Sequence, residues 1–256
     1  MSRQIGLAAL TCLELAPPDL VSAAAAAGYD RVGLRLIGVP GQTLPPFEQR
    51  ELEKRLADTG MKVLDVEIFR LEAGTRVASF EPTLAIAGRL KASEILVHGA
   101  DPEPARLADT FAQLCDLAGR YGLNANIEPM PWVDVSTVAQ AKRVISRSGR
   151  TNAAVLVDAI HFFRADNTFD DLKGAPLRYV QFCDAHPGRP TEVQEIIRQA
   201  RGDRLFPGEG ALDLRGLLKA LPADLPLSLE MPIAKKVEPF ERAKQAMAAT
   251  RRFLGG

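Results

Sequence analysis

A polar residue recurs every 30 to 32 positions along much of this chain, each time near the end of a short apolar run. Arg35, Glu67, His98, Glu128 and Asp158 follow one another at intervals of 32, 31, 30 and 30 residues. A strand, a helix and their connections together need about 30 residues, so each interval is predicted to hold one such unit. The chain has 256 residues, and one eighth of that length is 32.

Eight apolar runs are predicted to be β-strands, and helical patterns lie between them. The predicted strands are Gln4–Ala9, Arg31–Ile37, Lys62–Phe69, Glu94–Gly99, Asn124–Pro129, Ala154–Asp158, Arg178–Cys183 and Pro226–Glu230. The clearest predicted helices are Phe47–Gly60, Pro104–Gly122, Ser136–Gly149 and Val237–Leu254. Nearly continuous apolar strands are typical of parallel strands buried on both faces. The pattern predicts an α/β fold, a single (β/α)8 TIM barrel, and a doubly wound sheet is the competing arrangement.

Composition narrows the class of protein. No break in composition divides the chain, so residues 1–256 are predicted to form one barrel domain. Lys plus Arg and Asp plus Glu each number 32 and aromatic residues make up only 6%, which argues against a nucleic-acid partner. No apolar run approaches the roughly 20 residues that span a bilayer, so no membrane partner is expected. Three cysteines without CxxC spacing exclude a disulfide framework and, with no signal peptide apparent, favour a cytoplasmic protein.

The strand-end residues are predicted to meet at one mouth, because active sites of such barrels form at the carboxyl ends of the strands. The polar series continues with Gln181 and Glu230. The carboxylates of Glu67, Glu128, Asp158 and Glu230 would then repel one another unless a cation neutralised them. A divalent metal ion is therefore predicted. For any single carboxylate, a helix N-cap or an ion pair in a loop is the alternative.

The motifs around these residues resemble the xylose isomerase-like barrel enzymes, a group of sugar isomerases and epimerases. The resemblance covers nearly the whole chain and rests on IEP at Glu128, VDAIH from Asp158 to His161, VQFCDA at Gln181, FPGEG, and SLEMP at Glu230. It implies that Glu128, Asp158, Gln181 and Glu230 bind one divalent metal ion. It also implies that His161 contacts the substrate.

The position of Gln181 departs from many members of the family, which have histidine there. Three carboxylates and one amide carbonyl form an all-oxygen ligand set. Such a set favours Mg²⁺ or Mn²⁺ over Zn²⁺, with Co²⁺ as a further option. The same glutamine resembles the 3-dehydroshikimate dehydratase branch of the superfamily. His186, five residues farther along, is not expected to be the missing ligand.

The predicted activity is a divalent-metal-dependent isomerisation or epimerisation of a small polyhydroxylated keto-sugar through an enediolate, with Glu128, Glu230 and His161 as catalytic residues. A lyase of the 3-dehydroshikimate dehydratase kind is the alternative, because loss of a β-hydroxyl can follow the same proton abstraction. A binding protein without catalysis and a DNA-repair endonuclease are further readings. The intact carboxylate set argues against the first, and three histidines with zero net charge argue against the second.

Other polar residues of the mouth are predicted to bind the substrate: Arg35, Glu67, His98, His161 and Arg204. The two arginines suit a carboxylate or phosphate group, and an ion pair with a mouth carboxylate is the alternative for each. The segment from Asp184 to about Ala211 is predicted to be an active-site loop with a short helix. The only partner predicted is a small-molecule substrate, and the formation of a homo-oligomer stays open.

Overall fold

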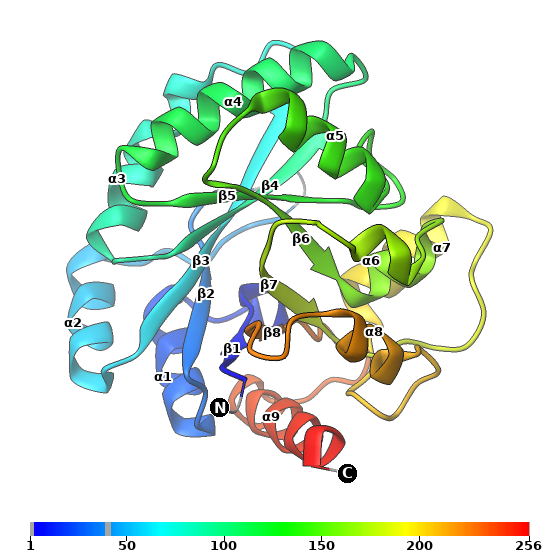
Figure 1. The fold of residues 1–256 in the computed structure, drawn as a ribbon. Coiled ribbons are helices and arrows are strands. Elements are labelled where there is room, and N and C mark those ends of the chain that lie inside the picture. The colour runs from blue at the N-terminus through cyan, green and yellow to red at the C-terminus, as the bar shows by residue number, and fades with distance from the viewer. Residues whose placement is uncertain (1–2, 39–41, 256) are drawn as a thin grey trace.

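The eight strands form a closed parallel barrel, which confirms the predicted TIM-barrel fold (Figure 1). A computed structural model describes residues 3–38 and 42–255. Each strand pairs with the next along the chain, and β1 pairs in parallel with β8 to close the ring. The strands are β1 (Ile5–Leu7), β2 (Arg31–Arg35), β3 (Lys62–Glu72), β4 (Glu94–Ala100), β5 (Asn124–Glu128), β6 (Ala153–Asp158), β7 (Leu177–Phe182) and β8 (Leu227–Leu229).

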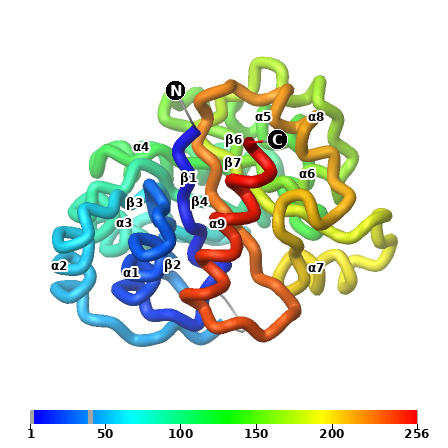
Figure 2. The backbone as a smooth tube through the Cα atoms, turned by 90° about the horizontal axis from the view of Figure 1, so that it is seen from below, coloured from blue at the N-terminus to red at the C-terminus, as the bar shows by residue number. Residues whose placement is uncertain are grey.

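Helices surround the barrel and cover its outer face (Figure 1). They are α1 (Pro17–Ala27), α2 (Gln49–Thr59), α3 (Glu81–Arg89), α4 (Pro104–Gly119), α5 (Val138–Ser148), α6 (Ala159–Arg164), α7 (Val193–Gly202), α8 (Leu214–Ala220) and α9 (Pro239–Gly255). Figure 2 shows α9 running beside β1 at the closure of the barrel. Here the Tyr29 hydroxyl, just after α1, donates to the carbonyl of Ala243 in α9 at 3.0 Å. Within residues 3–38 and 42–255, no helix has the length and apolar character needed to cross a membrane.

One predicted boundary was wrong in a way that matters for the site. Strand β3 does not end at Phe69 but continues to Glu72, because it stays paired with β4 as far as Ala100. This extension carries Arg70. The segment after β7, predicted as a loop with a short helix, does contain such a helix, α7, which has ten residues.

The strand register places the recurring polar residues at the same level of the barrel. Arg35 of β2 pairs with Glu67 of β3, and His98 of β4 pairs with Glu128 of β5. Asp158 of β6 pairs with Gln181 of β7. Side chains two positions apart in a strand point the same way. The residues two positions earlier therefore form the layer beneath the mouth, and Leu96, Leu156 and Tyr179 there belong to one buried cluster.

Candidate active site

The mouth of the barrel contains a cavity of about 270 Å³. Seven of the predicted site residues line it: Arg35, Glu67, His98, Glu128, His161, Arg204 and Glu230. The other two, Asp158 and Gln181, are fully buried and contact residues of this lining. The periodic pattern in the sequence therefore identified a set of side chains that the fold brings together.

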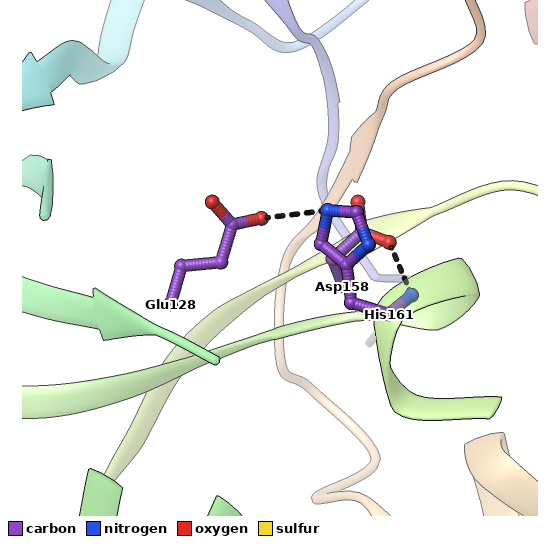
Figure 3. Close-up of side chains that lie close together, drawn as sticks. All are labelled: Glu128, Asp158 and His161. Carbon is purple, nitrogen blue, oxygen red and sulfur yellow. Dashed lines mark hydrogen bonds and ion pairs between the residues drawn. The ribbon is translucent and has the colours of Figure 1, made fainter. Parts of the chain in front are cut away.

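Glu128, Asp158 and His161 form the most compact group of metal-ligand type within the described residues. Each offers one ligand atom, and these atoms lie within 4.8 Å of one another. Figure 3 shows the Glu128 carboxylate facing the imidazole of His161, whose Nε2 is 3.6 Å from Oε1 of Glu128. Asp158 ends β6 and caps α6, because its side chain accepts from the backbone N–H of His161 at 3.2 Å. Asp158 is therefore a helix N-cap, the alternative given for a single carboxylate, and it also belongs to the metal-ligand group.

Two histidines, one on strand β4 and one on helix α6, contact the Glu128 carboxylate. Nε2 of His98 lies 2.9 Å from Oε2 of Glu128, and His161 approaches the other oxygen. Burial is the main reason that the pKa of His98 falls to about 3 and that of His161 to about 4, so both rings are neutral at pH 7. Burial, together with the charge of Asp158, raises the pKa of Glu128 well above its usual range. We predicted substrate contacts for these histidines, and the structure adds a contact of each with Glu128.

Arg204 joins two carboxylates that were predicted to bind metal. Its guanidinium lies 2.6 Å from Oδ2 of Asp158 and 2.6 Å from Oε2 of Glu230, with 1% of the side chain exposed. Burial acts to raise the pKa of Asp158, but the charge and hydrogen bond of Arg204 and the contacts with His161 together outweigh it, and that pKa is lowered. Arg35 likewise forms an ion pair with Glu67 at 2.7 Å. Both arginines therefore form ion pairs with carboxylates of the mouth, the alternative to binding a substrate anion. Their side chains also line the cavity.

The oxygen of the Gln181 amide is available to a ligand. The Gln181 amide nitrogen donates to Oε1 of Glu230 at 2.8 Å. Its Oε1 atom is buried and has no hydrogen-bond partner among residues 3–38 and 42–255. An unpartnered buried carbonyl beside carboxylates fits a hard cation. The compact metal-ligand group shares Glu128 and Asp158 with the predicted set. It contains His161 and not Glu230, whose side chain is turned toward Arg204 and Gln181.

Charge balance gives a second test of the fit to a divalent cation. The buried part of the mouth holds four carboxylates, Glu67, Glu128, Asp158 and Glu230, and two guanidinium groups, Arg35 and Arg204. If all six groups are ionised, two negative charges are left. One divalent cation would neutralise them. The residues that would hold it are Glu128, Asp158, Gln181 and Glu230. Without a cation, burial raises the pKa values of Glu128 and Glu230 well above their usual range.

Sequence reasoning did not identify four other polar residues that line the cavity, Gln42, Arg70, Glu72 and Arg201. Arg70 and Glu72 follow the predicted end of β3, and Arg201 lies in the last turn of α7. No helical spacing links Arg201 to Arg204, because α7 ends at Gly202 and Arg204 lies two residues beyond it. Trp132 meets His161 edge to face, with ring centroids 4.8 Å apart, and lines the cavity too.

Asp184 fixes the FPGEG segment beside the site. Its buried carboxylate accepts from the backbone N–H groups of Ala185, Gly208, Gly210 and Leu212 at 2.9 to 3.1 Å. A Cβ on Gly210 would collide with this carboxylate and with the carbonyl of Ala185.

We predict that Asp184→Ala lowers the free energy of unfolding by about 2–3 kcal/mol, because it leaves buried N–H donors without an acceptor. Urea unfolding measures the loss, and hydrogen exchange should accelerate at residues 208–212. The exposed Asp213 supplies the control, since its side chain only caps α8. Equal losses in Asp184→Ala and Asp213→Ala would contradict this role.

The fold and the mouth cluster define a TIM barrel with a buried acidic site that is bridged by arginines. The chain belongs to the xylose isomerase-like TIM barrel family, whose sequence model matches residues 21–253. This confirms the family resemblance. The structure is also similar to that of the IOLI protein with a bound zinc atom, with a TM-score of 0.83, 19% identity and coverage of 98% of both chains.

Two curated relatives are enzymes. A 3-dehydroshikimate dehydratase from Pseudomonas aeruginosa is 31% identical over 236 residues, covering 84% of this chain and 36% of the relative. An inosose isomerase from Bacillus velezensis is 31% identical over 118 residues, covering 44% of this chain and 40% of the relative. The chain thus spans only about a third of the length of the dehydratase.

Proposed function

We propose that this chain is a divalent-metal-dependent isomerase or epimerase that acts on a small polyhydroxylated ketone through an enediolate. One observation carries the proposal. Carboxylates from β5, β6 and the end of β8 share a buried mouth in which four carboxyl groups face two guanidinium groups and one amide oxygen has no partner among the described residues. When bound there, Mg²⁺ or Mn²⁺ would polarise the substrate carbonyl as a Lewis acid. The zinc of the IOLI protein supports the presence of a metal ion and not its identity.

The residues of the chain supply proton transfer. Glu128, flanked by the two neutral imidazoles, is placed to remove the proton next to the substrate carbonyl once it is ionised. Glu230, on the other side of the ring of strands, is placed to return a proton. Return to the other face of the same carbon is an epimerisation, and return to the neighbouring carbon is an isomerisation. His161, fixed between Asp158, Glu128 and Trp132, is positioned to donate or accept a hydrogen bond at a substrate oxygen.

Dehydration is the second candidate, and a specific observation favours it. Gln181 stands at the level of Asp158, as in the dehydratase branch, and the dehydratase relative aligns with 84% of the chain. In this reaction the proton next to the carbonyl passes to a glutamate, and its bonding pair forms the new carbon–carbon double bond. The β-hydroxyl takes up a proton from an acid of the site and leaves as water. A protonated Glu128 or Glu230 has the raised pKa that such an acid needs.

Metal titration of the protein tests the shared part of both candidates. We expect protein freed of metal by chelation to bind about one Mn²⁺ or Mg²⁺ per chain in calorimetry. Glu230→Gln should weaken that binding at least about tenfold, because it removes one charge from the ligand set. Glu209→Gln, an exposed glutamate of the neighbouring FPGEG segment, should bind metal like the wild type.

Product analysis then separates the candidates. Epimerisation or isomerisation in deuterium oxide places deuterium in the recovered keto-sugar, whereas dehydration of 3-dehydroshikimate gives an absorbing conjugated acid. Failure to bind Mg²⁺, Mn²⁺ or Co²⁺ at millimolar concentrations would overturn both candidates.

A further inference from the structure

The rim of the cavity carries two arginines that form no ion pair with the buried carboxylates of the described residues. Four arginines line the cavity in all: Arg35, Arg70, Arg201 and Arg204. Arg35 and Arg204 are buried and form ion pairs with carboxylates of the floor. Arg70 is 39% exposed and pairs with Glu72, which is itself more than half exposed. Arg201 makes no side-chain hydrogen bond or ion pair with any residue in the described ranges, although the cavity is otherwise rich in carboxylates.

The position of Arg201 is fixed by contacts of Arg204, which lies two residues beyond the end of α7. Nε of Arg204 donates to the carbonyl of Ala200 at 2.7 Å, and the Arg204 backbone N–H donates to Pro232 at 3.0 Å. The Arg204 guanidinium is held between two buried carboxylates. The last turn of α7 is thereby tied to the barrel, so Arg201 stands at the cavity on an anchored turn. An unpaired cation on such a turn can meet a ligand with little loss of backbone freedom.

The two rim arginines approach the cavity from opposite sides. Arg70 lies on the extension of β3. Arg201 lies on α7, which follows β7, and β7 is on the opposite side of the barrel from β3. Arg70 is paired in register with His98 of β4, and Arg70, Arg201 and His98 all line the same cavity.

The charge of the rim is opposite to that of the floor. Arg70 and Arg201 against Glu72 leave one positive charge at the rim, whereas the buried floor keeps two negative charges for a cation. A neutral keto-sugar would give the rim arginines no counter-charge. We infer that Arg201 and Arg70 form an anion subsite that binds the carboxylate of the substrate, at the end remote from the reacting carbonyl. This inference rests on the proposed function, and it names the substrate class as small hydroxy-keto acids.

The chemistry of guanidinium suits this task. A guanidinium group presents parallel N–H donors that match the two oxygens of a carboxylate, and such charge-assisted hydrogen bonds are stronger than neutral ones. Glu72 accepts from Nε of Arg70 and orients that side chain, leaving its terminal nitrogens for a ligand. The limited volume of the cavity, about 270 Å³, agrees with a ligand of one small ring or a short chain.

Binding of a matched pair of probes tests the subsite without requiring turnover. The probes are 3-dehydroshikimate and its methyl ester, which differ in the negative charge, and binding is measured by calorimetry with the Mn²⁺-loaded protein. We expect the wild type to bind the acid at least about tenfold more tightly than the ester, and Arg201→Met to weaken only the acid, by about tenfold to a hundredfold. Arg70→Met should act in the same direction. Arg198→Met is the control, because Arg198 lies on the same helix, is 55% exposed and pairs with Glu195 and Asp203 away from the cavity.

The outcomes separate this inference from the proposed function. Selective loss of acid binding in Arg201→Met supports the subsite even if neither isomerisation nor dehydration of the probe is detected, in which case only the proposed chemistry fails. Equal binding of acid and ester by the wild type, or equal losses for both probes in Arg201→Met, would overturn the subsite. Tighter competition by inorganic phosphate than by the acid would also overturn it, since it would assign the rim to a phosphate group.

Discussion

Replacing Arg204 with methionine is expected to lower the free energy of unfolding of the metal-free protein by about 3–5 kcal/mol, because the carboxylates of Asp158 and Glu230 would stay buried without their partner. The Arg204 side chain is 1% exposed, so water cannot replace the lost contacts. Chemical denaturation at pH 7 measures the effect. Methionine keeps most of the side-chain volume, so the loss reports on charge more than on packing.

The same variant links stability to the cation site. Millimolar Mn²⁺ should stabilise Arg204→Met more than it stabilises the wild type, because the cation then supplies the only positive charge next to Asp158 and Glu230. Arg198→Met, an exposed substitution on the preceding helix α7, should leave the unfolding curve unchanged. A destabilisation of Arg204→Met below about 1 kcal/mol would show that the two carboxylates tolerate the loss by taking up protons.

Asp65→Asn is expected to change how stability depends on pH. Asp65 lies inside the barrel below the mouth, where one oxygen accepts from the Tyr179 hydroxyl at 2.9 Å and the other has no partner among the described residues. Burial, with the nearby charge of Glu67, raises its pKa to about 8. The folded protein therefore keeps a proton on Asp65 between about pH 4 and pH 8, whereas the unfolded chain releases it.

The sign of the effect follows from this proton uptake. Asp65 contributes its full stability below the pKa of the unfolded chain, and that contribution is lost as the pH rises through the folded pKa of about 8. Asparagine resembles the protonated acid but does not titrate. The two proteins should be similarly stable near pH 4, and Asp65→Asn should gain about 1.4 kcal/mol over the wild type for each pH unit up to about pH 8.

Unfolding curves at each pH between 4 and 8 measure this difference. The titration of other groups is shared by both proteins and cancels in the comparison. Asp58→Asn, an exposed aspartate paired with Lys54, should follow the wild type at every pH. Parallel curves for Asp65→Asn and the wild type would show that Asp65 is ionised in the folded protein.

The sequence predicted most of the fold because the signals for it are local. Apolar runs of strand length, and their separation by helical patterns, depend on residues close together in the chain. The strand bounds in the structure differ by a few residues, as at β1, which is only Ile5–Leu7 because a 3-10 helix begins at Ala9. The end of β3 was missed because its continuation depends on pairing with β4, which the sequence of β3 does not record.

The sequence predicted which residues gather at the barrel mouth, but it did not predict which of their side chains contact one another. The series of polar residues placed Glu67, Glu128, Asp158, Gln181 and Glu230 at strand ends, and the family resemblance implied which of them bind metal. Their partners come from other parts of the chain: the Arg204 guanidinium reaches back 46 residues to Asp158, and Tyr179 lies 114 residues from Asp65. Which of several charged groups meet depends on side-chain directions across the barrel, and periodicity carries no information about those.

The sequence by itself determined that this chain forms a TIM barrel with acidic strand ends, since a repeating unit of apolar strand and helix has few other ways to bury its apolar surface. Only the tertiary structure decided how those acids are compensated. It paired Asp158 and Glu230 with Arg204, Glu67 with Arg35, and Glu128 with two histidines, so that four buried carboxyl groups share two guanidinium groups. The physical reason is that charge compensation acts through space over a few ångströms, between groups that the chain separates by tens of residues.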